Sequence, residues 1–569
     1  MKKRTAWILA AAIAAVAIGA AGMGVLVLVL GGQSTRLAGN SYLFLRLDGD
    51  IPEQPPASDL EALFEKRPPS LRGLVESIDR ARSDPKVTGL LVRVADLGGA
   101  GWGKVDELRD AVTRFRSSGK PAYAHLEFGG NREYYLAAAC SKIYALPTAL
   151  VGVTGLAAEV TFFRKTLDKI GVQAQFEGVG KYKNAPNQFT ETGFTPPHRE
   201  QMDALLDSLY GDFVQGIARS RGKTPEEVKA IIDAGPYDAQ GALDAGLVDE
   251  LLYQDEVEDK LGGANRVGPG RYLQGGRSFG FETRPRIALI YAVGEIVAGE
   301  SRSGGLGELA GSDTVAAALR DARTDTTIRG IVLRVDSPGG FGPAADVIWR
   351  EVQLARRAKP VIVSMGDYAA SGGYYIAMGS DGIVAQRGTI TGSIGVFSGK
   401  FNLRGLYDKI GLSRDVLTRG AHADIYSEYR PWTEEERTRI RAQMKAFYED
   451  FVKRVAEGRK MSPEDVDAVA QGRVWSGAEA LEHGLVDKLG GLDDAVALAK
   501  TKAGIGKDHE VALVVLPERK GLFETLMERQ QEDVLESRLP RDIRAMLRWV
   551  RVLGDGAPAA RLPFDLRIR

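Results

Sequence analysis

Short apolar runs alternate with longer amphipathic stretches along most of the chain, and this pattern predicts a layered α/β protein. Buried strands are expected where the run is short, apolar and rich in β-branched residues, at 286–293, 330–335 and 360–366. Helices are expected where apolar positions recur with helical periodicity, at 313–323, 343–358 and 434–459. Strands that alternate with helices favour a mainly parallel sheet, whose functional groups gather where a strand ends and a helix begins.

The N-terminal segment has a different pattern, without polar positions. Residues 6–30 are uncharged and mostly apolar, and Lys2, Lys3 and Arg4 precede them. A helix rises about 1.5 Å per residue, so this run is long enough to cross a hydrocarbon core of roughly 30 Å. We predict an uncleaved transmembrane anchor at 6–30, with residues 1–5 in the cytoplasm and the remaining chain outside. A cleaved signal peptide is the alternative, but the run is long for one and no clear cleavage motif follows it.

The chain also contains an internal duplication. Residues 134–155, YYLAAACSKIYALPTALVGVTG, resemble residues 374–395, YYIAMGSDGIVAQRGTITGSIG, without a gap. Further blocks match in the same order, among them GLLVRVADLGG with GIVLRVDSPGG and ALDAGLVDEL with ALEHGLVDKL. We therefore predict two tandem copies of one α/β domain. The predicted order is a first copy at 41–260, a glycine-rich linker at 261–284, a second copy at 285–510 and a helical tail at 511–569.

The two copies differ at positions that carry chemistry. Ser371 precedes two glycines at the end of an apolar run, but its counterpart in the first copy is Asn131. Lys183 in the first copy lies opposite Ala423 in the second. A serine hydroxyl is a poor nucleophile until a base removes its proton, and a lysine kept neutral by burial can be that base. One site shared between two degenerate copies explains both differences.

Other interpretations of these residues stay open at this point. His422 and His483 lie in the second copy, and histidine is the usual base beside a serine nucleophile. Taken singly, Lys183 is typical of a solvated loop lysine, and Ser371 is typical of a small residue in a tight turn.

Composition excludes several other classes of function. The 75 basic residues balance 75 acidic ones, so no net charge points to a nucleic-acid partner. A single cysteine, Cys140, excludes intramolecular disulfides and cysteine-based zinc sites, and the five histidines form no pair at metal-ligand spacing. The chain also lacks a phosphate-binding G-x-x-x-x-G-K-[ST] loop. We expect no metal, no cofactor and no nucleic acid.

Residues from about 41 to 505 resemble a known family, the long, duplicated form of signal peptide peptidase A, also called protease IV. The resemblance is carried by the N-terminal anchor and by GEI, VLRVDSPGG, MGDYAASGGYYIA, TITGSIGV and VGKYKNAPNQFTETGFTP. It implies a membrane-anchored serine peptidase with a Ser-Lys dyad. It also implies a layered α/β fold similar to the Clp protease proteolytic subunit and the crotonases. It does not reach residues 511–569.

The resemblance also implies roles for individual residues. Ser371 would be the nucleophile, Lys183 the general base and Ser393 the residue that orients the lysine amine. Lys181, two residues before Lys183, is an alternative base. Backbone N–H groups would stabilise the oxyanion, and the glycines that would supply them are Gly372, Gly339 and Gly340.

The expected substrates are signal peptides left in the membrane after preprotein processing, together with similar apolar peptides. The resemblance implies a homotetramer in the bacterial inner membrane, with the catalytic part on the extracytoplasmic side. One alternative is a crotonase-type acyl-CoA enzyme, which an external location disfavours because coenzyme A is cytoplasmic. Another alternative is a non-catalytic membrane scaffold, which the complementary serine and lysine of the two copies disfavour.

Overall fold

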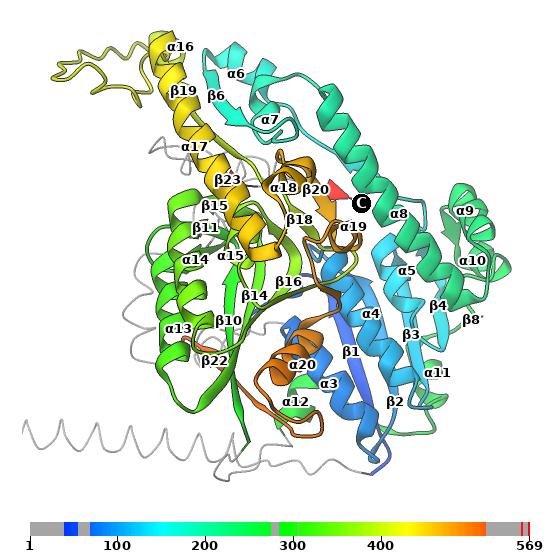
Figure 1. Cartoon of the computed structure of the whole chain (residues 1–569). Coiled ribbons are helices and arrows are strands. Elements are labelled where there is room, and N and C mark those ends of the chain that lie inside the picture. Colours follow the sequence, from blue (N-terminus) through cyan, green and yellow to red (C-terminus); the bar gives the residue numbers. More distant parts are fainter. Residues whose placement is uncertain are drawn as a thin grey trace, which may run out of the picture.

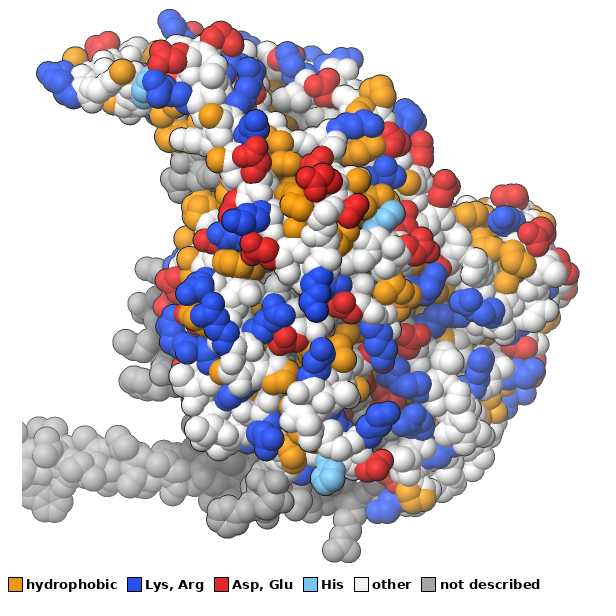
Figure 2. All heavy atoms as spheres, in the orientation of Figure 1, with side chains coloured by type: hydrophobic (Ala, Val, Ile, Leu, Met, Phe, Trp, Pro, Cys, Tyr) orange, Lys and Arg blue, Asp and Glu red, His pale blue; other side chains and the backbone are white. Residues whose placement is uncertain are grey.

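The computed structural model describes residues 39–54, 69–274, 284–304, 307–518, 559–561 and 567–568. The anchor predicted at 6–30 and its basic flank lie outside these residues. Within the described part, no helix is long and apolar enough to cross a membrane. Basic and acidic side chains are interspersed over the face of the molecule drawn in Figure 2.

Each half of the chain builds one mainly parallel sheet. The first sheet consists of β1 (Ser41–Asp48), β2 (Val87–Asp96), β3 (Ala122–Gly129), β4 (Lys142–Val151), β7 (Tyr237–Asp238), β8 (Glu250–Leu251) and β9 (Asn265–Val267). The second consists of β10 (Arg286–Val293), β14 (Ile328–Ser337), β16 (Val361–Ala370), β17 (Gly382–Ala385), β18 (Ile390–Gly392), β20 (Val474–Ser476), β21 (Lys488–Leu489) and β22 (Ala512–Leu516).

The two sheets have the same strand order, which confirms the tandem α/β repeats. The first runs β7-β4-β3-β2-β1-β9 and the second β20-β18-β16-β14-β10-β22. β17 and β18 together take the place of the longer β4, and β7 and β20 are the antiparallel edge strands. In Figure 1 the two halves lie side by side, with the first sheet on the right and the second on the left.

A third sheet joins strands from both repeats. Its order is β12-β13-β11-β15-β23-β19-β6. These strands are β6 (Gln173–Val179), β11 (Glu295–Val297), β12 (Arg302–Gly304), β13 (Gly307–Gly311), β15 (Gly339–Phe341), β19 (Val396–Asn402) and β23 (Ala559–Arg561). β6 of the first repeat pairs antiparallel with β19 of the second along its whole length. A small separate sheet pairs β5 (Ala158–Glu159) with β24 (Arg567–Ile568).

Helices cover the two large sheets (Figure 1). Those of the first repeat are α3 (Leu71–Ser83), α4 (Trp102–Arg116), α5 (Asn131–Ala137), α6 (Arg164–Ile170), α7 (Asn187–Thr190), α8 (Pro196–Arg221), α9 (Pro225–Ala234), α10 (Ala239–Asp244), α11 (Gln254–Asp259) and α12 (Pro269–Gln274). Those of the second are α13 (Ser312–Thr324), α14 (Gly342–Arg356), α15 (Gly372–Ala377), α16 (Arg404–Ile410), α17 (Glu434–Arg459), α18 (Pro463–Val469), α19 (Gly477–Glu482) and α20 (Leu492–Lys502). The long α8 and α17 correspond in the duplication, and each has 26 residues.

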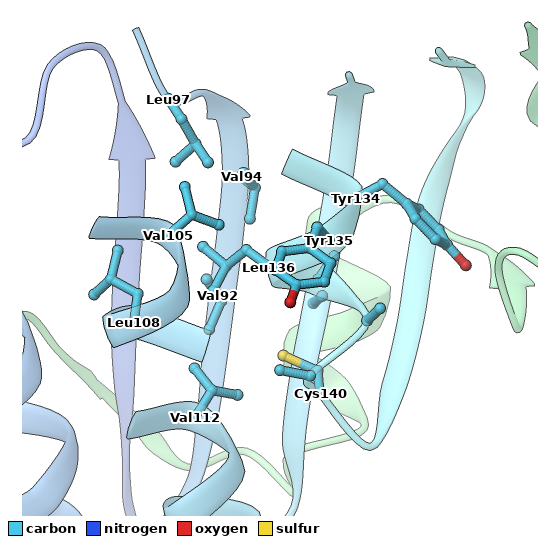
Figure 3. Close-up of a cluster of buried hydrophobic side chains, with 14 of the residues drawn as sticks. Val92, Val94, Leu97, Val105, Leu108, Val112, Tyr134, Tyr135, Leu136 and Cys140 are labelled. Carbon is cyan, nitrogen blue, oxygen red and sulfur yellow. The ribbon is translucent and has the colours of Figure 1, made fainter. Parts of the chain in front are cut away.

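The core of the first repeat lies between its sheet and helices α3, α4 and α5. Figure 3 shows Val105, Leu108 and Val112 of α4 facing Val92 and Val94 of β2. The three α4 residues recur at helical spacing, so one face of the helix is apolar and buried. Each such side chain contributes roughly 1.5–3 kcal/mol when it leaves water. The second repeat has an equivalent core between its sheet and α13, α14, α15 and α17.

Two predicted boundaries differ from the structure. β9 and α12 lie inside the predicted linker, and β9 pairs with β1, so the first sheet extends past residue 260. β22 lies inside the predicted tail and pairs with β10. The helical part predicted within the tail, 521–553, lies outside the described residues, and the described elements of the tail are strands β22, β23 and β24. The β22 sequence, ALVVL, is a short apolar run of the kind that fits a strand against β10.

A buried ionic network holds the two repeats together. Arg334, on β14, is almost completely inaccessible, and its guanidinium donates to the carboxylates of Glu53 and Glu107 from the first repeat, the latter at 2.8 Å. It also donates to the Ser364 hydroxyl at 2.7 Å and the Met365 carbonyl at 3.2 Å. A buried charge is tolerated only when it is paired and hydrogen-bonded. The network is therefore complete only while the repeats stay in contact.

We expect the Arg334→Met variant to unfold at a much lower urea concentration than the wild type. The substitution leaves two buried carboxylates without their main cation, a loss of about 3–5 kcal/mol. Urea unfolding followed by circular dichroism measures the effect. The control is Arg439→Met, because Arg439 is exposed and pairs with Glu435 one helical turn away. Equal small shifts of the midpoint in both variants would contradict a stabilising network.

Candidate active site

Ser371 lies between the end of β16 and the start of α15. Its backbone has φ 54° and ψ −109°, a conformation that residues with side chains rarely adopt. The Ser371 N–H donates to the Gly392 carbonyl at 2.8 Å, which ties the turn to the end of β18. Strained strand-to-helix turns cluster at functional sites. The turn holds the Ser371 hydroxyl at the carboxyl end of the parallel sheet.

Lys183 comes from the first repeat but lies in the second. β6 ends at Val179, which pairs with Val396 at the start of β19. The loop after Val179 then contacts the segment just before β20, where the Tyr182 N–H donates to the Gln471 carbonyl at 2.8 Å. As a result, the Lys183 side chain is buried and 188 residues separate it in sequence from Ser371.

Three oxygen atoms surround the Lys183 amine. Its Nζ lies 2.6 Å from Ser371 Oγ, 2.9 Å from Ser393 Oγ and 3.1 Å from the Ser393 carbonyl oxygen. Ser393 also has a positive φ, 50°, and its N–H donates to the Arg473 carbonyl at 2.6 Å. The amine of the sequence-predicted lysine therefore lies within hydrogen-bond distance of both sequence-predicted serines.

Burial lowers the pKa of Lys183 well below its usual value. Desolvation is the cause of the shift, and no carboxylate among the described residues counters it by favouring the ammonium form. An amine in these surroundings loses its proton at a lower pH than a solvated lysine does.

The glycines of the predicted oxyanion site lie beside this group. Gly372 is the first residue of α15, where a helical N–H has no partner within the helix. The Ser337–Gly340 turn packs against the start of α15, since a Cβ on Gly373 would lie 2.8 Å from the Ser337 carbonyl oxygen. The Gly339 N–H donates to the Ser337 hydroxyl at 3.1 Å. Gly340, at φ +156°, pairs with Ile296 in the third sheet.

The equivalent turn of the first repeat has a structural hydrogen-bond network instead. Asn131 is the first residue of α5, and its side-chain oxygen accepts from the N–H groups of Thr154 at 3.0 Å and Gly155 at 3.2 Å. Its side-chain nitrogen donates to the Gly155 carbonyl at 2.8 Å. Val153 stands where the second repeat has Ser393, and it is fully buried. Asparagine therefore closes this turn without a nucleophile.

The alternative bases have other partners. Lys181 is exposed, donates to the Tyr182 hydroxyl at 3.0 Å and lies 3.5 Å from Glu200. His422 lies 3.7 Å from the carboxylates of Glu435 and Glu436. The His483 ring packs on Trp475 with ring centroids 4.1 Å apart. Within the described residues, no group of three or more histidines, cysteines or carboxylates is arranged to hold a metal ion.

Two glycines that position Lys183 were missed by sequence reasoning. A Cβ on Gly472, at φ +81°, would lie 2.5 Å from the Lys183 backbone nitrogen. A Cβ on Gly395 would lie 3.2 Å from Lys183 Cδ. The duplication contained a signal for Gly472, because Gly235 of the first repeat also lies just before an edge strand, β7, and packs closely on Val153.

Comparison with known proteins identifies the family of the chain. The fold, the strained serine and the related proteins define the class, a serine peptidase. The chain belongs to peptidase family S49, whose model matches residues 114–267 and 353–506.

Relatives extend over most of the chain. The "Serine protease SPPA, chloroplastic" of Arabidopsis thaliana is 35% identical over 84% of this chain and 72% of its own length. "Protease 4" of Salmonella typhi is 32% identical over 92% of this chain and 88% of its own length. A shorter match, the "Putative signal peptide peptidase SppA" of Enterococcus faecium, is 37% identical over 32% of this chain and 54% of its own. The match to the solved structure of ClpP1 from Listeria monocytogenes covers 36% of this chain and 94% of that chain at 16% identity, with a TM-score of 0.23.

We expect Gly472→Ala to lower kcat by about 10²-fold, because a displacement of the lysine by a few tenths of an ångström to 1 Å misaligns the reacting groups. The matched control is Gly484→Ala. Gly484 has a similar φ of +71°, but a Cβ there would meet only the Met461 sulfur at 3.8 Å. Both variants bear the cost of a left-handed alanine, roughly 1–2 kcal/mol of stability. Equal peptidase rates in the two variants would contradict a positioning role for Gly472.

Proposed function

We propose that this protein is a serine endopeptidase with a Ser-Lys dyad, in which Ser371 is the nucleophile and Lys183 the general base. The observation that carries the proposal is the 2.6 Å distance between Ser371 Oγ and Lys183 Nζ, in a buried setting where desolvation lowers the pKa of the lysine. A histidine is not needed as the base, since desolvation makes a neutral amine accessible near neutral pH.

The hydrogen-bond capacity of a neutral amine fits the contacts of Lys183. A neutral amine has two hydrogens and one lone pair. Its two hydrogens can be donated to the hydroxyl and the carbonyl oxygen of Ser393, at 2.9 and 3.1 Å. The lone pair is then left to accept the Ser371 hydroxyl hydrogen. Ser393 is in this scheme the positioning residue that aims the lone pair at the nucleophile.

The reaction follows from these positions. Lys183 takes the Ser371 proton as Ser371 Oγ attacks the carbonyl carbon of the scissile peptide bond. Lys183 then gives the proton to the leaving amine, which departs and leaves an acyl ester on Ser371. A water molecule, deprotonated by Lys183, hydrolyses the ester and restores the serine.

Negative charge on the attacked carbonyl needs fixed hydrogen-bond donors, each typically worth about 3–4 kcal/mol in the transition state. We assign one donor to the Gly372 N–H, at the start of α15. The second comes from the Gly339–Gly340 pair. The Gly339 N–H already donates to the Ser337 hydroxyl, so a substrate oxygen would share this donor. The Gly340 N–H is the other candidate for the second donor.

We further propose that the substrates are remnant signal peptides and similar apolar peptides, as the name of the Enterococcus faecium relative suggests. The N-terminal apolar run at 6–30 would anchor the chain in the bacterial inner membrane with the catalytic part outside. We also propose a homotetramer, and the loop after α16 supports it. This loop projects from the body at the upper left of Figure 2. There Leu412, Val416 and Leu417 are exposed, the last at 93%, as expected for a contact with a second copy.

Substitution of either dyad residue should abolish peptidase activity with folding intact. We expect Ser371→Ala and Lys183→Met each to lower kcat at least about 10³-fold on a fluorogenic apolar peptide. Lys181→Met is the matched control, because its side chain is exposed two residues away, and it should keep full activity. Activity retained in Lys183→Met, or lost in Lys181→Met, would overturn the assignment of the base.

The pH profile gives an independent test of the same residue. The base must be neutral, so kcat should rise with pH through the lowered pKa of Lys183 and reach a plateau well below the usual lysine pKa. A rate that stays constant down to pH 5, measured on the same peptide, would contradict a lysine base.

Removal of the Ser393 hydroxyl should weaken the dyad without changing the turn. Ser393→Gly keeps the positive φ free of strain, and we expect kcat to fall by about 10–100-fold with KM unchanged. The Ser393 oxygen favours the ammonium form of Lys183, so its loss should move the acid limb of the pH profile to lower pH. A limb that stays in place would mean that Ser393 has only a structural role.

A further inference from the structure

Strand β16 has a bulge shortly before the turn that holds Ser371. The register of β14 and β16 shifts after Val335, so that residues 366–368 of β16 lie opposite Asp336 alone. The Asp336 carboxylate accepts the Tyr368 N–H at 3.0 Å, which fastens the bulge to β14. Bulges bend a strand and re-aim the residues that follow, and they are frequent beside active sites. The position of Ser371 therefore depends on how this bulge is held.

The first repeat holds the bulge from the other side. The carboxylate of Asp367, in the middle of the bulge, accepts the N–H groups of Gly101 at 2.7 Å and Lys104 at 2.8 Å. Both groups belong to the N-terminus of α4, where N–H groups have no partner within the helix and a negative charge is favoured. Figure 1 shows α4 next to β16 at the boundary between the two halves. The bulge is thus part of the contact between the repeats.

The Lys104 side chain bridges the two aspartates. Only 12% of it is exposed, and its Nζ lies 3.2 Å from the carboxylate of Asp336, 3.7 Å from that of Asp367 and 3.8 Å from that of Glu53. Nζ also donates to the Ile51 carbonyl at 3.4 Å. Burial alone would lower the pKa of Lys104, but the three carboxylates outweigh it and hold the pKa above its usual value. Lys104 is therefore a fixed cation between the ends of β14 and β16.

We propose that Lys104 is a positioning residue, which ties the ends of β14 and β16 together and so fixes the distance between the nucleophile and the oxyanion donors. The inference rests on the proposed function, since it takes Ser371 and the Gly339–Gly340 pair as groups of the active site. Asp336 lies three residues before Gly339, and Asp367 lies four residues before Ser371. A displacement of either strand end is therefore transmitted to the site through a few residues of chain, and an error of 1 Å there slows the reaction strongly.

The first repeat, which has no nucleophile, lacks the same arrangement. Its stretch 121–134 is one residue shorter than the equivalent stretch 360–374, which contains the bulge. Ala95 stands in the position of Asp336 and cannot pair with a cation. The charged bridge therefore accompanies the nucleophile, as expected of residues that position the reacting groups.

Loss of the cation should slow the reaction without weakening substrate binding. We expect Lys104→Met to lower kcat for a fluorogenic apolar peptide by about 10–100-fold with KM unchanged, because the strand ends lose their common partner. The matched control is Lys359→Met, at the opposite end of β16. Lys359 Nζ donates to the Ala322 carbonyl at 2.7 Å, far along the strand from the bulge, and this variant should keep the wild-type kcat. Equal rates in the two variants would overturn the inference.

A transition-state analogue separates positioning from a loss of folded protein. A peptide aldehyde adds reversibly to Ser371, and the oxygen of the adduct occupies the oxyanion site. We expect Lys104→Met to raise the inhibition constant of the aldehyde by about 10–100-fold, while the corresponding peptide alcohol, which cannot add to the serine, binds as it does to the wild type. A variant that merely folds less well has fewer active molecules but the same inhibition constant. An unchanged constant for the aldehyde would therefore overturn the positioning role.

Asp336→Asn tests the same bridge with a smaller change in the buried charge. Asparagine keeps an acceptor for the Tyr368 N–H, and Lys104 keeps two carboxylate partners, so we expect a loss of kcat of about tenfold. The double variant with Lys104→Met should be no slower than Lys104→Met alone, because both substitutions act on one contact. Losses that multiply would overturn the shared role. A wild type that the aldehyde does not inhibit, or activity that survives Ser371→Ala, would refute the proposed function instead.

Discussion

The antiparallel pairing of β6 with β19 is the contact on which the arrangement of the site depends. The pair joins the two repeats over seven consecutive residues on each strand and ends at Val179 opposite Val396. Lys183 follows β6 by a few residues and Ser393 precedes β19 by a few residues, so the short reach of the chain holds both near the end of this pair. A register shift by one residue would turn every side chain of the strand to the opposite face. The register thus determines whether a lysine of one repeat can meet a serine of the other.

The site and the interface around it use burial in opposite ways. Arg334, Glu53 and Glu107 are buried as charges because each has a partner of opposite sign. Lys183 is buried without such a partner, and its pKa is lowered for that reason. A neutral amine is poorly suited to stabilise the fold but well suited to accept a proton. Backbone strain is also found at the site, since Ser371 and Ser393, both in contact with Lys183, have positive φ values.

The divergence of the two repeats explains why the first repeat does not carry an equivalent site. The first repeat keeps the strand-to-helix turn but closes it with the Asn131 hydrogen bonds, and it keeps the edge-strand glycine, Gly235. The second repeat keeps the equivalent turn with Ser371 and contacts the lysine through Gly472. Each repeat therefore retains a complete sheet, while the polar groups of the site are divided between them. The third sheet, which belongs to both repeats, provides the connection and also the strand-wide interval that β23 occupies.

Much of the fold and the candidate site could be predicted from the chain alone. Alternating apolar runs and amphipathic stretches indicated the α/β repeats, and the repeat comparison singled out Ser371 and Lys183, because local periodicity and residue type are properties of the sequence itself. Ser393 was implied by the resemblance to signal peptide peptidase A. The strands β9 and β22 were missed, since each is short and is stabilised mainly by pairing with a strand distant in sequence.

Other features were decided only by the tertiary structure. These are the close packing of Gly472 on Lys183, the burial that lowers the lysine pKa, and the pairing of β23 with β15 and β19. Each of them depends on the distance between segments far apart in the chain. Residue type and periodicity determine which strands and helices form, but the register and packing between those elements determine which atoms meet.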